Sequence, residues 1–401
     1  MDNRPKLYAT VAFVAGVLVC LGFKDLYPDL ERRYRRRYGV RKTLTSSSLA
    51  LDDQIHLEDH EAIDYEDAKA SDVPVGIEAC IGNTPFSKSS HCPKLQFLNG
   101  GGGSPKDRVA LSMINTAEEE GLLTPHSGDT IYEGTVGSTG ISLATLGAVV
   151  ERVPPAPIVD PMHFVNRART LAAEHTADPN RAGRGYFADQ FENAANWHAH
   201  FTGTGPEIYR QCHGKLDAFV AGAGTGGTIA GVARFLKSHL PHLDVVLADP
   251  QGSGLYNRIK YGVMFNPVER EGTRRRQQVD TIVEGIGINR VTANLEAGRE
   301  LIDDAVKVTD DQALKMARWL VEKDGIFVGS SAAVNCVAAV ETAQRLGKGK
   351  RVVTILCDSG SKHLSKFWAR AGNIGGKVDS TLAHVMSEST PVDKATQIET
   401  D

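Results

Sequence analysis

The sequence predicts an α/β protein with two lobes around a cleft, and three observations support this fold class. Apolar runs typical of buried strands end in turns of glycine and other small residues. Helices with apolar residues at i, i+3, i+4 and i+7 follow these turns. The chain has 401 residues, of which 41% are hydrophobic and 23% charged, which is the composition of a soluble globular enzyme large enough for two lobes.

Charge and cysteine content narrow the class of protein. The net charge of −4 gives no sign of a nucleic-acid-binding surface. The six cysteines are scattered, without a CxxC pair or a Cys/His spacing typical of zinc, so no metal site is predicted. They are expected to be reduced thiols in a cytosol-like compartment.

The N-terminal segment 1–42 is predicted to be a membrane anchor with a basic flank. Residues 7–23 form an uncharged apolar run, at the short end of what crosses a bilayer as a helix. Lys24 and the arginines of 32–37 follow it, whereas only Arg4 and Lys6 precede it. Positive charge resists translocation, so the catalytic domain should face the cytosol. A cleaved signal peptide is the alternative, although its positive charge should precede the apolar run.

Three further boundaries follow from composition. Residues 43–74 are serine-rich and then acidic, with little apolar periodicity, and are predicted to be a solvated linker. The catalytic domain is assigned to 75–372, with a small lobe at roughly 108–185 within the larger lobe. Residues 373–401 are polar and aperiodic and are predicted to be a disordered tail.

Lys106 is the candidate nucleophile. It follows the glycines 100–103 and Pro105, and it stands just before a helix that the spacing of Ala110, Met113 and Ala117 predicts. At the positive end of a helix the dipole disfavours the ammonium and favours the neutral amine that a Schiff base needs. A flexible glycine loop with an ordinary solvated lysine is the alternative.

A second group of candidates lies after a predicted strand at 129–133. The small residues 134–140 lead into a helix predicted at 141–150, so unpaired N–H groups and a helix dipole meet at one place. An amino-acid carboxylate would fit there, although a tight strand-to-helix connection is equally compatible. Gln190, at the end of a later apolar segment, has an amide that could donate to a carboxylate.

The third candidate is a phosphate-binding loop. The predicted strand 216–221 enters Gly224-Thr225-Gly226-Gly227-Thr228, and an amphipathic helix follows. The glycines also match a dinucleotide-binding pattern, with Asp249 about where a ribose-binding acid should lie. A nicotinamide-dependent enzyme is therefore a competing hypothesis, but it gives the Lys106 loop no role.

The fourth candidate is Ser359. The predicted strand 351–357 ends in Asp358-Ser359-Gly360, and a hydroxyl at the end of a parallel strand opens onto the same crevice as the phosphate loop. There it could bond a ring nitrogen. A third strand-to-turn edge is predicted at 325–331, before an alanine-rich helix to about Leu346. A helix N-cap is the alternative role of these serines.

Taken in order, these pieces resemble the cysteine synthase and cystathionine β-synthase family, over roughly residues 75–370. The motifs that carry the resemblance are Asn83-Thr84-Pro85, Ser104-Pro105-Lys106-Asp107-Arg108, Gly137-Ser138-Thr139-Gly140, Gln190-Phe191, Thr204-Gly205-Pro206-Glu207-Ile208, Gly224-Thr225-Gly226-Gly227-Thr228 and Asp358-Ser359-Gly360. The resemblance implies fold type II, in which pyridoxal 5'-phosphate (PLP) lies between two open α/β lobes. A membrane anchor makes the chain similar to a fungal cysteine-synthase-like branch, for which the mitochondrial outer membrane is the expected location.

Residue roles follow from the resemblance, position by position. Lys106 matches the Schiff-base lysine, which would also act as general base on the substrate Cα. Gly224, Thr225, Gly226, Gly227 and Thr228 match the phosphate loop, and Ser359 matches the partner of the pyridine nitrogen. Thr135, Val136, Gly137 and Thr139 match the loop that binds the substrate carboxylate, Ser138 matches the residue that reaches the cofactor oxygen, and Gln190 matches a helper of that loop.

The chain departs from the family pattern in two ways. The carboxylate loop usually reads Thr-Ser-Gly-Asn-Thr, so Val136 removes a hydroxyl donor and Ser138 is shorter than the usual asparagine. The stretches 86–98 and 141–190 are too short for the family's strand-and-helix units, since a βαβ unit takes roughly 30 residues. We infer that the chain is internally shortened and that its small lobe is incomplete.

The resemblance implies replacement of the β-substituent of an activated serine, such as O-acetylserine, by sulfide to give cysteine. The alternatives are another PLP-dependent elimination or replacement, forming cystathionine or acting as a dehydratase, and a catalytically impaired membrane-tethered homologue. The expected partners are the amino-acid substrate, sulfide or a thiol, the membrane and a second subunit in a homodimer.

Overall fold

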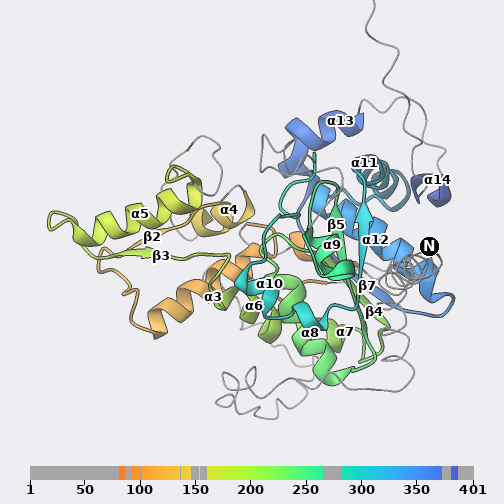
Figure 1. Cartoon of the computed structure of the whole chain (residues 1–401), viewed down its shortest axis with the longest axis horizontal. Helices are drawn as coiled ribbons and strands as arrows, with labels where there is room; N and C mark the ends of the chain where they lie inside the picture. Colours follow the sequence, from red (N-terminus) through yellow and green to blue (C-terminus); the bar gives the residue numbers. More distant parts are fainter. Residues whose placement is uncertain are drawn as a thin grey trace, which may run out of the picture. The chain divides into compact units, whose positions relative to one another are not determined.

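The computed structural model describes residues 81–85, 93–98, 102–135, 137–145, 153, 160–264, 281–372 and 381–386 (Figure 1). The chain divides into two units, 1–71 and 72–401, and every described residue belongs to the second. The predicted anchor 1–42 and linker 43–74 therefore lie outside the described residues. None of the helices that the structure describes combines the length and the apolar character needed to cross a bilayer.

A five-stranded parallel sheet forms the larger lobe. Its strands are β1 (Pro93–Leu95), β7 (Val352–Leu356), β4 (Ala218–Gly222), β5 (Asp244–Pro250) and β6 (Asp304–Val308), in that spatial order. Every pair of neighbours is parallel. The carboxyl ends of the strands therefore lie at one edge of the sheet, where ligands of open α/β sheets bind.

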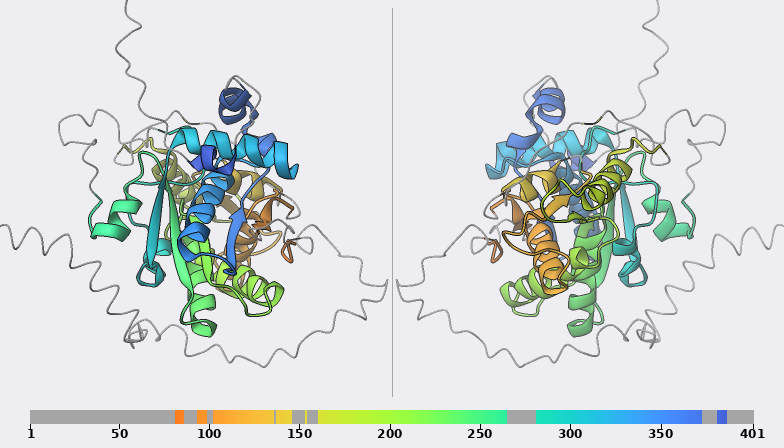
Figure 2. Two further views of the ribbon diagram at one scale, coloured as in Figure 1. Left: turned by 90° about the vertical axis from the view of Figure 1, so that its right-hand side faces the viewer. Right: turned by 90° about the vertical axis from the view of Figure 1, so that its left-hand side faces the viewer.

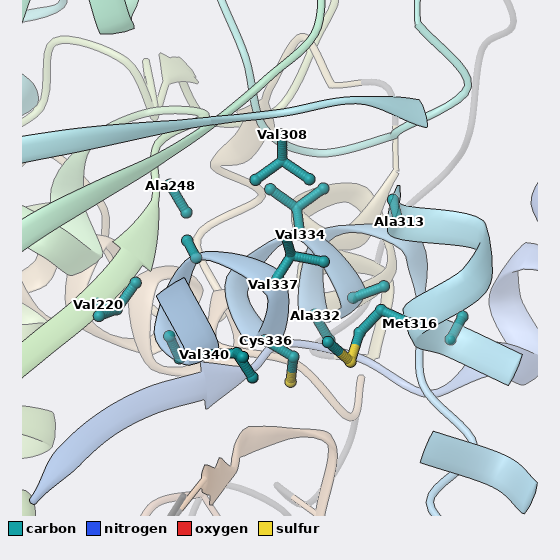
Figure 3. Packing of buried hydrophobic residues seen from close by; sticks show 14 of the residues in the cluster. Val220, Ala248, Val308, Ala313, Met316, Ala332, Val334, Cys336, Val337 and Val340 are labelled. Atoms are coloured by element: carbon teal, nitrogen blue, oxygen red, sulfur yellow. The ribbon is translucent and has the colours of Figure 1, made fainter. Parts of the chain in front are cut away.

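Helices cover both faces of this sheet, as the alternation of side chains along each strand requires (Figure 2). Helices α11 (Asp310–Trp319) and α12 (Ser330–Leu346) pack on one face, where Val220, Ala248 and Val308 meet Val334 and Val337 (Figure 3). Helices α7 (Gly205–Gln211) and α8 (Gly227–His239) pack on the other, against the alternate strand residues.

The smaller lobe is built on a two-stranded parallel sheet, which lies to the left of the larger sheet in Figure 1. Strand β2 (Thr130–Tyr132) pairs with β3 (Gly185–Phe187), and α5 (Phe164–Ala177) packs on both. Helix α3 (Lys106–Glu119) packs against α4 (Ser138–Thr145). Among the described residues the buried apolar cluster of this lobe has only four members, Val109, Met113, Ala188 and Ala195.

The remaining described elements are short. They are η3 (Gln96–Leu98), α6 (Ala195–Ala199), η4 (His200–Thr204), α9 (Leu255–Tyr261), α10 (Ala293–Glu296), η5 (Arg299–Leu301), η6 (Leu320–Asp324), η7 (Gly360–His363), η8 (Leu364–Trp368), α13 (Ala369–Gly372) and α14 (Leu382–Met386).

Several predicted elements differ from the structure. Residues 325–329, predicted as a strand-to-turn edge, form only an isolated bridge from Val328 to Ser359, and residues 96–98 form the helical turn η3 after β1. Strands β3 and β6 were not expected. Within the tail predicted to be disordered, α14 is ordered, because Val385 is buried against the core and the Met386 carbonyl accepts a hydrogen bond from Gln312. The rest of that tail lies outside the described residues.

Candidate active site

The glycine loop wraps back onto the first turn of α3, which begins at Lys106. The carboxylate of Asp107 accepts hydrogen bonds from the N–H groups of Gly102 and Ser104, both at 3.1 Å. A Cβ at Gly102 would lie 2.3 Å from that carboxylate, so only glycine allows the approach. Gly103 adopts φ +62°, in the left-handed region. The loop thus fixes the backbone directly before Lys106.

The amine of Lys106 lies in a setting that favours its neutral form. The side chain is half-buried, and burial lowers its pKa from the ordinary lysine value. The charges of Cys357, Asp358 and Asp107 act in the opposite direction but do not reverse the shift. Lys106 is therefore a better nucleophile and base at neutral pH than a solvated lysine.

A buried ion cluster holds α3 two residues further on. Arg108 donates to both carboxylate oxygens of Glu207 in α7, at 2.6 and 2.8 Å, and Lys94 of β1 lies 2.9 Å from the same carboxylate. Lys94 also donates to the Thr84 carbonyl and to Gln211. Burial alone would raise the pKa of Glu207, yet Arg108 and Lys94 lower it to about 2. This cluster ties β1, α3 and α7 together.

The predicted phosphate loop lies between β4 and the start of α8. Gly226 adopts φ +85°, and a Cβ at Gly224 would lie 2.1 Å from the Gly285 carbonyl oxygen. The first N–H groups of α8 have no acceptor within the helix and point out of its N-terminus. Thr225 accepts from Asn196 at 3.0 Å. The loop is a cradle for an anion at the carboxyl end of β4.

His200 contacts the phosphate loop through the side chain of Thr228. Its Nε2 atom lies 3.2 Å from the Thr228 hydroxyl, and its Nδ1 atom lies 2.9 Å from the Thr204 hydroxyl. Burial lowers the pKa of His200 well below its ordinary value, and the positive charges of Arg108 and Lys106 add to this effect. The imidazole is therefore neutral, and Lys106 is one of the charges near it.

Ser359 lies beyond the end of β7, next to β4 in the sheet. It caps η7, and its Oγ atom accepts from the N–H of Ser361 at 3.3 Å and from the Ser361 hydroxyl at 3.1 Å. Because Ser359 accepts in both contacts, its own proton is left to donate to a ring nitrogen. The helix-cap alternative and the ring-partner prediction are thus compatible.

The predicted carboxylate loop leads from β2 into α4. Thr135 Oγ1 accepts from the N–H of Gly137 at 3.3 Å, and Thr139 is buried. Ser138, the first residue of α4, donates to Asp358 at 3.1 Å and so links the two lobes. Val136 lies outside the described residues. Asp358 also lies 3.3 Å from His363, so its carboxylate is held by these two side chains.

Gln190 contacts this loop differently from the sequence expectation. Its side-chain amide donates to Glu133 Oε1 at 3.3 Å and to the Gly134 carbonyl at 3.1 Å, and its Oε1 atom accepts from the Thr139 hydroxyl at 2.6 Å. In this conformation its donors are engaged within the protein. Gln190 therefore orients Thr139, and it does not present a free donor to a carboxylate.

Lys106, the glycine loop at 224–228 and Ser359 come from distant segments but share one edge of the larger sheet. Strands β7 and β4 are parallel neighbours, so Ser359 and the glycine loop follow adjacent strand ends. The charge of Lys106 acts both on Cys357 at the end of β7 and on His200 behind the glycine loop. Burial raises the pKa of the Cys357 thiol to about 11, with Asp358 adding to the shift and Lys106 opposing it.

Sequence reasoning missed two parts of this site. Glu133 directly follows β2 and contacts Gln190, but in the sequence it looks like one more strand residue. Residues 285–287 pack on the phosphate loop, where Gly287 donates to the Ala223 carbonyl at 2.8 Å. The Gly-Ile-Gly pattern after a charged residue was the available signal for this second part.

Comparisons with known proteins assign the class. Residues 77–358 match the family model described as pyridoxal-phosphate dependent enzyme. A protein of Emericella nidulans named cysteine synthase 2 is 58% identical, over 96% of this chain and 99% of that protein. A Schizosaccharomyces pombe protein of the same name is 55% identical, over 80% and 91%.

Two solved structures are similar in fold. The O-acetylserine-dependent cystathionine β-synthase of Helicobacter pylori is 30% identical, with a TM-score of 0.60 over 73% of this chain and 98% of that one. O-ureido-L-serine synthase is 28% identical, with a TM-score of 0.61 over 76% and 98%.

The chain is therefore a PLP-dependent enzyme of fold type II, as the resemblance implied. Within that class it belongs to the cysteine synthase and cystathionine β-synthase family. The nicotinamide-dependent alternative is wrong. Asp249, which that alternative needed for a ribose, is buried and bonded to the N–H of Tyr256 at 2.8 Å and to Lys307 at 3.2 Å.

The residues present fit the cofactor. A dianionic phosphate suits the helix N-terminus at 224–228, where the first N–H groups of α8 have no acceptor within the helix. A Cβ at Gly224 would meet the Gly285 carbonyl oxygen, so glycine is needed for the backbone of this loop to pack as it does. The amine of Lys106 and the free proton of Ser359 suit an aldehyde and a ring nitrogen, respectively.

Proposed function

We propose that this chain is a cysteine synthase, which replaces the β-substituent of an activated serine, such as O-acetylserine, by sulfide. The observation that carries the proposal is its 58% identity to cysteine synthase 2 of Emericella nidulans over nearly the whole chain. The H. pylori neighbour, whose description names O-acetylserine, supports the choice of substrate class.

The residue roles under this proposal are those implied by the family resemblance, and the contacts above support them. Lys106 would hold PLP through its amine, and this amine, which burial favours in its neutral form, would accept the substrate Cα proton. Bound PLP supplies the electron sink that makes this proton acidic. Gly224, Thr225, Gly226, Gly227 and Thr228 bind the phosphate, and the neutral Ser359 hydroxyl bonds the ring nitrogen.

The substrate carboxylate is assigned to the loop before and at the start of α4. Thr135, Val136, Gly137 and Thr139 would bind it, with Gln190 orienting Thr139. Ser138, which contacts Asp358 here, would reach toward the cofactor from the smaller lobe. Because Ser138 replaces a longer side chain, formation of cystathionine or dehydration of serine is the second candidate activity.

Purified full-length protein tests these activities. We expect a yellow protein that releases PLP on denaturation and forms cysteine from O-acetylserine and sulfide. The same preparation would be assayed with homocysteine, for cystathionine, and with serine alone, for release of a keto acid. Cystathionine or keto acid without cysteine would replace the proposed activity by the second candidate. A colourless protein that takes up no PLP would contradict both and favour the impaired homologue.

We also propose that residues 7–23 anchor the enzyme in a membrane, with the mitochondrial outer membrane as the favoured location. The uncharged run and the basic residues after it support this. A Saccharomyces cerevisiae relative, 49% identical, is named as a candidate mitochondrial cysteine synthase. The native protein should stay with the outer mitochondrial membrane after alkaline carbonate extraction, and a variant lacking residues 1–42 should be released. Release of both proteins would contradict the anchor.

A further inference from the structure

Glu133 binds Gln190 through both carboxylate oxygens. Its Oε2 atom accepts from the main-chain N–H of Gln190 at 3.1 Å, and its Oε1 atom accepts from the side-chain amide at 3.3 Å. The Oε1 atom of the same Gln190 amide accepts from the Thr139 hydroxyl at 2.6 Å. A relay of hydrogen bonds therefore runs from Glu133 through Gln190 to Thr139.

This relay fixes which way the Gln190 amide points. Its oxygen and nitrogen are similar in size, so hydrogen-bond partners decide the orientation. The Gly134 carbonyl and Glu133 Oε1 accept from this amide, so they hold the NH₂ group on their side. The amide oxygen then faces Thr139, whose hydroxyl proton is turned toward it. Glu133 thus determines, through Gln190, the direction of the hydroxyl proton of Thr139 in the predicted carboxylate loop.

The surroundings of Glu133 favour its protonated form. Burial raises its pKa to about 8, the hydrogen bond from the main-chain N–H of Gln190 acts in the opposite direction, and the charge of Asp189 adds to the rise. Asp189 is itself paired with Arg169 of α5 at 3.4 Å. Tyr186 of β3 interacts electrostatically with Glu133. His163 caps α5 beside Gly134, and burial lowers its pKa, so it is neutral near pH 8.

We propose that Glu133 is a positioning residue for the substrate: it orients the Gln190 amide and carries a proton when an amino-acid carboxylate binds at residues 135–139, taking that proton up from solvent wherever it is ionised beforehand. The inference rests on the proposed function, which supplies that carboxylate. The substrate carboxylate brings a second negative charge to the other end of the relay. This charge disfavours the ionised form of Glu133 further. Proton uptake cancels the added charge, so binding weakens once the pH is too high to supply the proton.

The test compares the wild-type holoenzyme with Glu133→Gln, which keeps the size and cannot ionise, at the loss of one of the two hydrogen bonds that Glu133 accepts from Gln190. For the wild type, KM for O-acetylserine should rise by about tenfold per pH unit above pH 8, with kcat changing much less. In E133Q this extra rise should disappear, while titrations shared by both enzymes remain. Equal pH profiles of KM in the two enzymes would overturn the proposal.

A second variant separates orientation from charge. Glu133→Ala removes both acceptors, so the Gln190 amide loses its fixed orientation and KM should rise at every pH. Asp129→Asn, in the same lobe but away from the relay and paired with Arg184, is the matched control and should leave KM unchanged. If E133A binds substrate as well as the wild type does, the positioning role is wrong.

A spectroscopic readout works without turnover. In infrared difference spectra the carbonyl stretch of a protonated carboxyl group should disappear as the pH rises through about 8, and this titration should be absent in E133Q. If the band titrates but no cysteine forms, the proposed function fails alone. If cysteine forms but no such band titrates, the inference about Glu133 fails alone.

Discussion

The amine of Lys106 combines two properties that a surface lysine lacks. It stands at the first position of a 14-residue helix, and it is partly withdrawn from water, so both the helix dipole and desolvation oppose its charge. The two residues that follow it act on its surroundings, since Asp107 holds the loop in front and Arg108 enters the buried ion cluster behind.

We predict that Lys106→Ala abolishes borohydride fixation of the cofactor and lowers kcat by about a hundred- to ten-thousand-fold, as expected when a general base is removed. Mass spectrometry of the reduced protein and steady-state kinetics measure the two effects. The exposed Lys323→Ala is the control and should behave as the wild type does. A K106A protein that still carries the reduced cofactor would assign the attachment to another lysine.

At this scale the sequence predicted residues well where a motif fixes chemistry, and less well where contacts decide the role. The glycines at 224–228 and Ser359 follow adjacent strand ends, as their places after predicted strands implied, and the roles of these residues and of Lys106 stay predictions. The partners of Gln190 could not be predicted, because Glu133 lies 57 residues away and meets it only through the pairing of β2 with β3.

Among the elements, helix α3 is held by the contacts of two consecutive residues in its first turn. Asp107 accepts from the glycine loop and also from Ser142 of α4 at 2.6 Å, while Arg108 reaches α7 through Glu207. Helix α4 belongs to the smaller lobe and α7 to the larger one. The helix that bears Lys106 is therefore also the one that joins the two lobes. The predicted period of α3 identified its buried face, but it gave no sign of the ion cluster beside it.

We predict that Glu207→Gln lowers the free energy of unfolding by about 3–5 kcal/mol, because it leaves Lys94 and Arg108 buried without their counter-charge. Urea unfolding followed by tryptophan fluorescence measures this. Glu296→Gln, which removes a surface partner of Arg299, should cost about 0–1 kcal/mol. Equal losses in both variants would contradict the importance of burial.

The same cluster makes the stability of the folded protein depend on pH. The pKa of Glu207 in the folded protein is about 2, below its ordinary value of 4.5, so the folded state holds this proton less tightly than the unfolded state does. Its contribution to stability is present above pH 4.5 and is lost as the pH falls toward 2. E207Q should not show this part of the acid unfolding.

On the scale of the whole molecule, the two lobes differ in how completely they are built. The larger lobe has five parallel strands covered on both faces, whereas the described part of the smaller lobe has a two-stranded sheet. The alignment with the Emericella relative spans 433 positions, more than the 401 residues of this chain, so that relative has residues without a counterpart here. The shortened small lobe inferred from the sequence stays a prediction, as does the position of those additional residues within it.

We predict that inserting the missing segment of the Emericella protein between residues 145 and 160 raises the melting temperature and the PLP content of the purified protein. A pair of strands alone is marginally stable, and additional strands give it neighbours. Calorimetry and cofactor quantification measure the outcome, with a glycine–serine insert of equal length as the control. Equal gains from both inserts, or from neither, would contradict an incomplete lobe.

The protonated thiol of Cys357 has a consequence for an enzyme that handles sulfide. Bond formation at an electrophilic carbon needs a sulfur anion, and a thiol with a pKa of about 11 supplies almost none at neutral pH. The external sulfur donor therefore meets no competition from the side chain that stands beside Lys106, and the protein is spared self-alkylation during turnover.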